Sequence, residues 1–105
     1  MKQMLAVTKT DSDKVNLLNQ LSRANEFSAA DSGIAYGQKA LALAEKIDFK
    51  AGIVLAEINL SGCYNALANF RLGLYYALKA LSLAQELNDH HSIIRGNAKL
   101  GECYY

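Results

Sequence analysis

The sequence predicts an all-α protein built from antiparallel pairs of helices, with about five helices in two and a half repeats. Three observations lead to this prediction. Alanine and leucine supply 16 residues each of the 105, and proline is absent, which is the composition of packed helices. The chain repeats itself with a period of forty residues. Within each period the apolar residues recur at helical spacing.

The repeat is visible when the chain is aligned on itself with an offset of forty. Residues 33–44 then match residues 73–84, and Cys63 matches Cys103. Of the 33 pairs aligned from position 33 onward, 11 are identical, which is far more than chance gives in this composition. A helix pair that cannot bury its apolar stripe alone does so by stacking on the next pair.

Capping residues and short connections divide the chain into helices. Residues 1–11 are expected to form a flexible N-terminal extension, and residues 12–105 the repeat domain. Very short connections require that neighbouring helices pack antiparallel. The predicted helices and their candidate N-caps are 12–26 (Asp11 or Ser12), 29–47 (Ser28, with Asp31 three residues later), 49–67 (Asp48), 70–88 (Asn69) and 90–104 (Asn88 or Asp89).

All seven glycines fall inside predicted helices, where each costs about 1 kcal/mol relative to alanine. Gly33 and Gly73 occupy the same repeat position, early in a helix. We interpret these glycines as sites where two helix backbones approach closely, in preference to ligand contacts.

The residues that repeat resemble a known family. The run Leu60–Tyr64, followed by Ala68–Phe70, Gly73, Tyr76 and Ala80–Leu81, is similar to a tetratricopeptide repeat. Leu100–Tyr104 matches the first-helix signature better, and Leu21–Asn25 is a weaker copy. The period exceeds the common 34 residues, and the usual proline is missing. Both features resemble the longer variety found beside bacterial signalling modules and in kinesin light chains.

The resemblance implies a non-enzymatic protein–protein interaction module, the docking or sensing part of a bacterial signalling protein. In this family the first helix of each repeat lines a concave face that binds a peptide or partner protein. Registering Leu21, Leu60 and Leu100 transfers that face to this chain. The expected concave-face residues are Asn16, Asn19, Gln20, Arg23 and Glu26 on the first helix, Leu55, Ile58, Asn59, Gly62 and Asn65 on the third, and Arg95, Ala98, Lys99, Glu102 and Tyr105 on the fifth.

A subset of this face resembles the carboxylate clamp of chaperone-binding members. Asn59, Arg95 and Lys99 stand at clamp-like positions with suitable chemistry. Asn19 and Arg23 depart from the clamp, because lysine and asparagine are expected there. The alternative interpretation, which we favour, is that Arg95 and Lys99 form a solvated face and that Asn59 is structural.

The sequence offers no catalytic, cofactor or metal site. His90 and His91 are adjacent, so they point about 100° apart on a helix and do not share a ligand well. Cys63 and Cys103 are interpreted as packing residues. The net charge of +1 argues against nucleic acid, and no apolar run is long enough for a membrane helix. A cytoplasmic protein is therefore expected.

The last predicted helix lacks a partner helix within the sequence. It is expected to present an uncovered apolar stripe formed by Ile93, Leu100, Cys103 and Tyr104. Repeat arrays normally need a polar terminal helix. We therefore expect a fragment of a longer array that forms a homodimer through this stripe. The alternative function is a self-assembly element of the parent protein.

Overall fold

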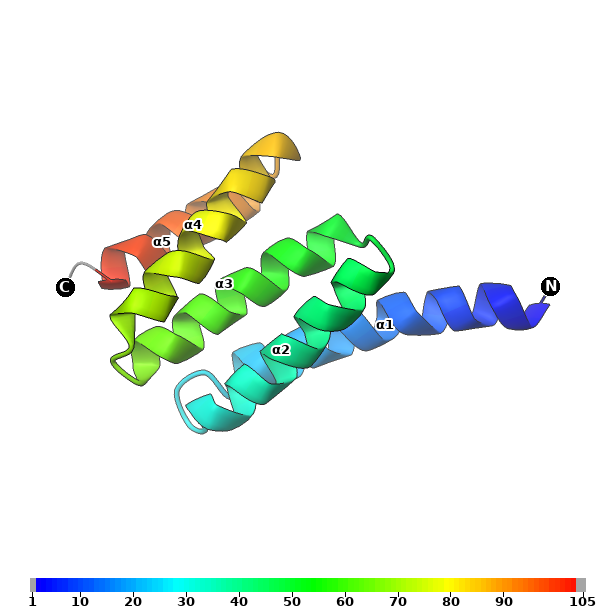
Figure 1. Ribbon diagram of the computed structural model, residues 1–105, viewed down its shortest axis with the longest axis horizontal. Helices are drawn as coiled ribbons and strands as arrows, with labels where there is room; N and C mark the ends of the chain where they lie inside the picture. The colour runs from blue at the N-terminus through cyan, green and yellow to red at the C-terminus, as the bar shows by residue number, and fades with distance from the viewer. Residues whose placement is uncertain (1, 104–105) are drawn as a thin grey trace.

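The computed structural model describes the backbone of residues 2–103 and the side chains of residues 11–103. All regular structure in this part of the chain is helical. The chain runs as a row of antiparallel helices (Figure 1), so the predicted all-α fold of helix pairs is confirmed. The helices are α1 (Lys2–Ala24), α2 (Ala30–Lys46), α3 (Lys50–Ala66), α4 (Phe70–Glu86) and α5 (His90–Cys103).

Three identical turns set the period of the repeat. Helices α2, α3 and α4 have 17 residues each and are each followed by a three-residue connection. The middle residue of each connection, Asp48, Ala68 or Asn88, has a positive φ of 54–62°. The amide after it donates to the carbonyl five residues earlier, at 2.8 to 2.9 Å. This C-terminal motif satisfies carbonyls at the end of each helix. Because each helix and its connection have the same length, a pair of helices recurs every forty residues.

The geometry of the turns determines which of the predicted N-cap residues cap a helix. The side chain of Asn69 accepts a hydrogen bond from the amide of Leu72, and that of Asp89 accepts one from the amide of Ser92. The prediction for Asp48 is wrong because it occupies the left-handed position, one residue before the N-cap of α3. The prediction of Ser28 as an N-cap is also wrong, because α2 starts after Ala29 and has no side-chain cap.

Helix α1 is longer than the sequence predicts. It begins at Lys2, whereas the sequence pattern predicts a start near residue 12, with residues 1–11 as an extension. Residues 2–11 contain neither glycine nor proline and include good helix formers. Once a helix is nucleated, each such residue adds a backbone hydrogen bond at little cost. The helix therefore extends past its expected N-cap.

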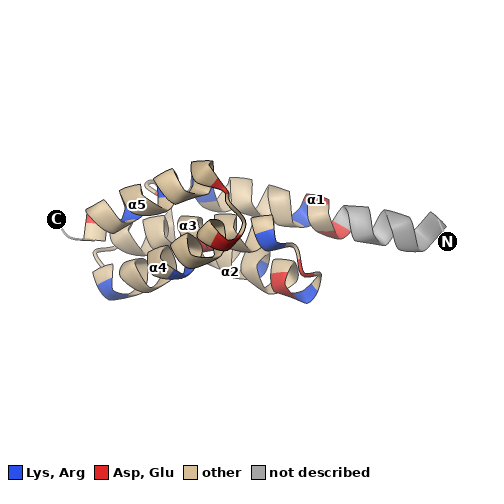
Figure 2. Ribbon diagram, turned by 90° about the horizontal axis from the view of Figure 1, so that it is seen from above, with Lys and Arg blue, Asp and Glu red and all other residues tan. Residues whose placement is uncertain are grey.

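Helix α3 is the centre of the fold. It contacts each of the other four helices. Helices α1, α3 and α5 form one layer, with α3 in the middle. Helices α2 and α4 form a second layer that packs against α3 (Figures 1 and 2). Two core clusters follow from this position: Ala40, Leu41, Ala56 and Leu60 between α2 and α3, and Val54, Ile58, Ala80 and Ala84 between α3 and α4.

Close backbone approach explains the glycines at the repeat position, as predicted. A Cβ on Gly33 would lie 3.0 Å from the Ser22 carbonyl oxygen and 2.6 Å from the sulfur of Cys63. A Cβ on Gly73 would lie 3.3 Å from the Ser61 carbonyl oxygen and would collide with the Asn65 side chain. Both glycines also accept the same tertiary hydrogen bond. Ser22 Oγ donates to the Gly33 carbonyl and Ser61 Oγ to the Gly73 carbonyl, each at 2.7 Å. Gly101 is different, because a Cβ at that position would have no described atom within 4 Å.

Candidate interaction groove

A groove runs along the layer of α1, α3 and α5. Helices α1 and α5 both contact α3, which forms the floor. The groove consists of two adjoining cavities of about 240 and 320 Å³. The first is lined by Asn16, Asn19, Gln20, Arg23, Leu55, Asn59 and Arg95, and the second by Arg23, Glu26, Phe27, Arg95, Ala98 and Lys99.

Two asparagines, Asn19 on α1 and Asn59 on α3, form the floor of the first cavity. Asn59 Nδ2 donates to the Asn19 backbone carbonyl at 3.1 Å and lies 3.3 Å from Asn19 Oδ1. Asn19 Nδ2 donates in turn to the carbonyl of Gly52 at 3.3 Å. These bonds tie α1 to α3. The Oδ1 atom of Asn59 is buried and has no partner among the described residues, so the floor retains an unused acceptor.

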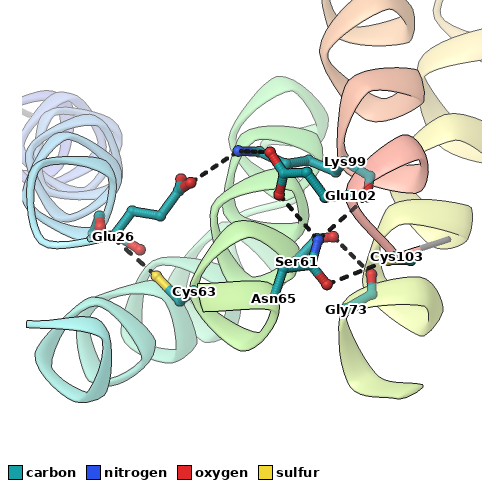
Figure 3. Close-up of polar contacts among 9 residues, drawn as sticks. Glu26, Ser61, Cys63, Asn65, Gly73, Lys99, Glu102 and Cys103 are labelled. Carbon is teal, nitrogen blue, oxygen red and sulfur yellow. Dashed lines mark hydrogen bonds and ion pairs between the residues drawn. The ribbon is translucent and has the colours of Figure 1, made fainter. Parts of the chain in front are cut away.

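An ion pair closes the second cavity. Lys99 Nζ lies 2.9 Å from Glu26 Oε2 and 3.4 Å from Glu102 Oε2. Glu26 lies in the α1–α2 connection and Lys99 on α5, so this bridge spans the layer above α3 (Figure 3). Gly62 lies beneath it, and a Cβ at that position would collide with the Glu26 carboxylate. Glycine at position 62 therefore makes room for the bridge.

A second set of contacts fastens α5 to α3. Asn65 Nδ2 donates to the Lys99 carbonyl at 3.2 Å and to Glu102 Oε1 at 3.1 Å. The thiol of Cys103 donates to Asn65 Oδ1 at 3.3 Å (Figure 3). Burial raises the pKa of both Cys103 and Cys63. Both cysteines therefore favour the neutral thiol, in keeping with a packing role.

The structure brings most of the expected concave-face residues together. Those that line the groove are Asn16, Asn19, Gln20, Arg23, Glu26, Leu55, Asn59, Arg95, Ala98 and Lys99. Four described members of the expected face lie elsewhere. Ile58 is wholly buried against α4, Gly62 lies under Glu26, and Asn65 binds α5. Glu102 holds Lys99 and Asn65, and Tyr105 lies outside the described residues.

The clamp-like residues have unequal roles. Lys99 is engaged by two carboxylates, and its side chain is only 14% exposed, so it is not the solvated lysine that the sequence suggests. The amide nitrogen of Asn59 is committed to Asn19, as a structural role requires. Arg95 is the clamp-like residue whose charged group is not engaged. It lines both cavities and forms no ion pair with the described residues.

The described members of the apolar stripe expected on α5 are not left uncovered, contrary to the prediction. Ile93 packs against the core cluster of α3 and α4, and Leu100 and Cys103 are half-buried. Tyr104 lies outside the described residues. The uncovered apolar side chain is Ile94, which is 69% exposed. Ile94 corresponds in the repeat to Val54, which is fully buried.

Two further residues escaped the sequence reasoning. Phe27 is 83% exposed beside the second cavity. Glu57 on α3 is almost fully buried, with Oε2 3.8 Å from Lys79 Nζ on α4 and Oε1 without a partner among the described residues. Burial raises the pKa of Glu57 to about 7; Lys79 opposes this rise and Glu45 adds to it. A single glutamate in a helical pattern gives no signal of such burial.

The groove has no cluster of metal-binding side chains. Among residues 11–103, no three His, Cys, Asp or Glu side chains gather as metal ligands would. No helix in the described part of the chain has the length and apolar character that crossing a membrane requires. Comparisons of the chain with protein-family models, curated proteins and solved structures gave no match.

Proposed function

We propose that this chain is a non-enzymatic, tetratricopeptide-like interaction module that binds an extended peptide or partner segment in the groove of α1, α3 and α5. We further propose that it serves as the docking or sensing part of a cytoplasmic bacterial signalling protein. The groove itself supports binding most directly: three helices contribute amides, two guanidinium groups and a half-buried leucine to one concave surface. Such mixed linings suit segments that offer both backbone and side-chain groups.

The arrangement of these groups favours a peptide over a small apolar ligand. Asn16 and Gln20 project exposed amides along one turn of α1, and Leu55 supplies an apolar contact on the floor. Amide side chains both donate and accept, as a peptide backbone does. The Oδ1 of Asn59 lies buried beneath this lining and has no hydrogen-bond partner among the described residues.

The test is selection of binders from a displayed library of random peptides. Leu55→Arg places a charge in the first cavity and is expected to abolish binding of the selected peptides. Leu78→Arg on the outer side of α4, where Leu78 is 50% exposed, is the matched control and is expected to leave binding unchanged. Failure to select any peptide, or loss of binding only with Leu78→Arg, would contradict the proposed groove.

Self-association is a second candidate function, and the exposure of Ile94 favours it. Val54 and Ile58 are fully buried on α3, whereas their repeat equivalents on α5, Ile94 and Ala98, are exposed. A second copy of the chain that places its α5 against this face would form a two-fold dimer. Light-scattering mass across a hundredfold dilution, on the native chain and on Ile94→Lys, tests this. A dimer that dissociates in the variant supports assembly, and a monomer in both contradicts it.

A further inference from the structure

Arg23 and Arg95 occupy the middle of the groove. They lie on α1 and α5, and they are the two residues that line both cavities. A segment that follows the groove across α3 therefore passes between two guanidinium groups. Their position makes them the central charged feature that such a segment meets.

These two cations are not neutralised within the described structure. Neither forms an ion pair, although Glu26 lies in the same cavity. Lys99 holds the carboxylates of Glu26 and Glu102, at 2.9 and 3.4 Å. The carboxylates of the groove are therefore engaged by its lysine, and its arginines are left without partners among the described residues.

The arginines also act on each other. Burial lowers the pKa of Arg95, and the charge of Arg23 lowers it further, while Glu26 acts in the opposite direction. Two like charges held close together store repulsion that a bound anion relieves. Because guanidinium groups lose their protons only at extreme pH, both remain charged and able to donate.

We propose that this pair binds a phosphorylated serine or threonine side chain of the segment in the groove. The inference rests on the proposed function and names the chemical group that the groove selects. A phosphate carries close to two negative charges and three acceptor oxygens, so it is able to receive donors from both arginines at once. A side-chain carboxylate carries one charge, so it neutralises only one of the two guanidinium groups.

The surroundings suit a phosphorylated segment. Asn16 and Gln20 offer neutral donors along α1 beside Arg23. On the other side of the pair, the exposed ring of Phe27 offers an apolar contact to a neighbouring residue of the segment. The phosphate would then fix the register of a segment whose flanks rest on amides and on one aromatic ring.

The experiment compares three peptide libraries that are degenerate except at one central residue. That residue is phosphoserine, glutamate or serine, and inorganic phosphate serves as a separate probe. We expect the phosphoserine library to bind at least about tenfold more tightly than either other library. Arg23→Gln and Arg95→Gln should each remove this preference. Arg95→Lys should weaken it, because lysine lacks the planar fork.

Arg71→Gln on α4 is the matched control, since Arg71 is exposed and lies outside both cavities. Thermal unfolding of each variant verifies that it is folded. Equal binding of the phosphoserine and glutamate libraries would overturn the proposal, as would inorganic phosphate binding as tightly as the peptides. Peptide binding without any preference for phosphoserine would overturn this inference and leave the groove intact. Absence of binding by all three libraries would contradict the groove as well.

Discussion

Helices α3 and α5 occupy the same place in successive repeats, yet they differ in what covers them. Both begin after a left-handed turn residue, and both contribute to the groove. On α3, Val54 and Ile58 are fully buried because α4 and α5 pack over them. On α5, Ile94 and Ala98 hold the equivalent positions and are exposed. The burial of a repeat position therefore depends on its neighbours as much as on its own residue.

The same comparison explains how the groove is held. Helix α3 binds α1 through neutral groups: the Asn59 amide donates to Asn19, and the Cys63 thiol donates to the Ser22 carbonyl. The residue that corresponds to Asn59 on α5 is Lys99, which binds Glu26 of the α1–α2 connection by charge. The same repeat position therefore forms an amide hydrogen bond on α3, in the middle of the layer, and an ion pair on α5, at its edge.

The largest expected difference between the two helices is in the cost of removing an isoleucine. Ile58→Ala empties a fully buried site and is expected to lower the free energy of unfolding by about 3 kcal/mol. Ile94→Ala alters an exposed side chain and should change it by less than about 0.5 kcal/mol. Urea unfolding of both variants measures this contrast. A comparable loss for Ile94→Ala would mean that another chain covers α5 in solution.

A smaller difference is expected in pH dependence. The pKa of Glu57 rises from 4.5 to about 7 on folding, so between these values the folded state binds more protons than the unfolded state. Glu57 therefore stabilises the fold below about pH 4.5. This contribution, on the order of 3 kcal/mol, is lost as the pH rises through about 7.

Glu57→Gln should remove this part of the pH dependence and raise stability at about pH 8, where the native carboxylate is charged and buried. Asn97 is the repeat equivalent on α5 and is exposed, so Asn97→Glu should add no comparable dependence. Urea unfolding at about pH 5 and about pH 8 provides the measurement. An unchanged pH slope in Glu57→Gln would show that other groups cause it.

The smallest expected effect concerns the turn that ends α3. Ala68 has a φ of 62°, a conformation that costs about 1 kcal/mol for an alanine. Ala68→Gly should therefore raise the free energy of unfolding by about 1 kcal/mol. Ala42→Gly, in the exposed middle of α2, is the control and should lower it by a similar amount. Destabilisation by both substitutions would indicate that chain entropy outweighs the strain at Ala68.

The sequence predicted those features that depend on repetition. The forty-residue offset revealed the helix pairs, and the equivalence of Gly33 and Gly73 revealed the close approach of their helices. Most groove residues also followed from registering equivalent leucines. These predictions held because a repeat contacts its neighbours in the same way each time.

The remaining features depend on contacts that no local pattern records. Ile93 and Ile94 are adjacent and equally apolar, yet they point about 100° apart, so composition does not tell which one is covered. The contact of Lys99 with Glu26 joins positions 73 residues apart and has no counterpart in another described repeat. Both features follow from how the helices pack together, which only the structure shows.

The Lys99–Glu26 bridge has a consequence for how the chain unfolds. In a linear array the terminal units fray independently, because each unit touches only the next one. Here a side chain of α5 neutralises a carboxylate that is buried beside α1 and has Gly62 of α3 beneath it. When α5 detaches, that carboxylate loses its counterion, which weakens the opposite end of the layer. The bridge therefore makes the loss of one end a cooperative event, and amide exchange in α1 becomes sensitive to the anchoring of α5.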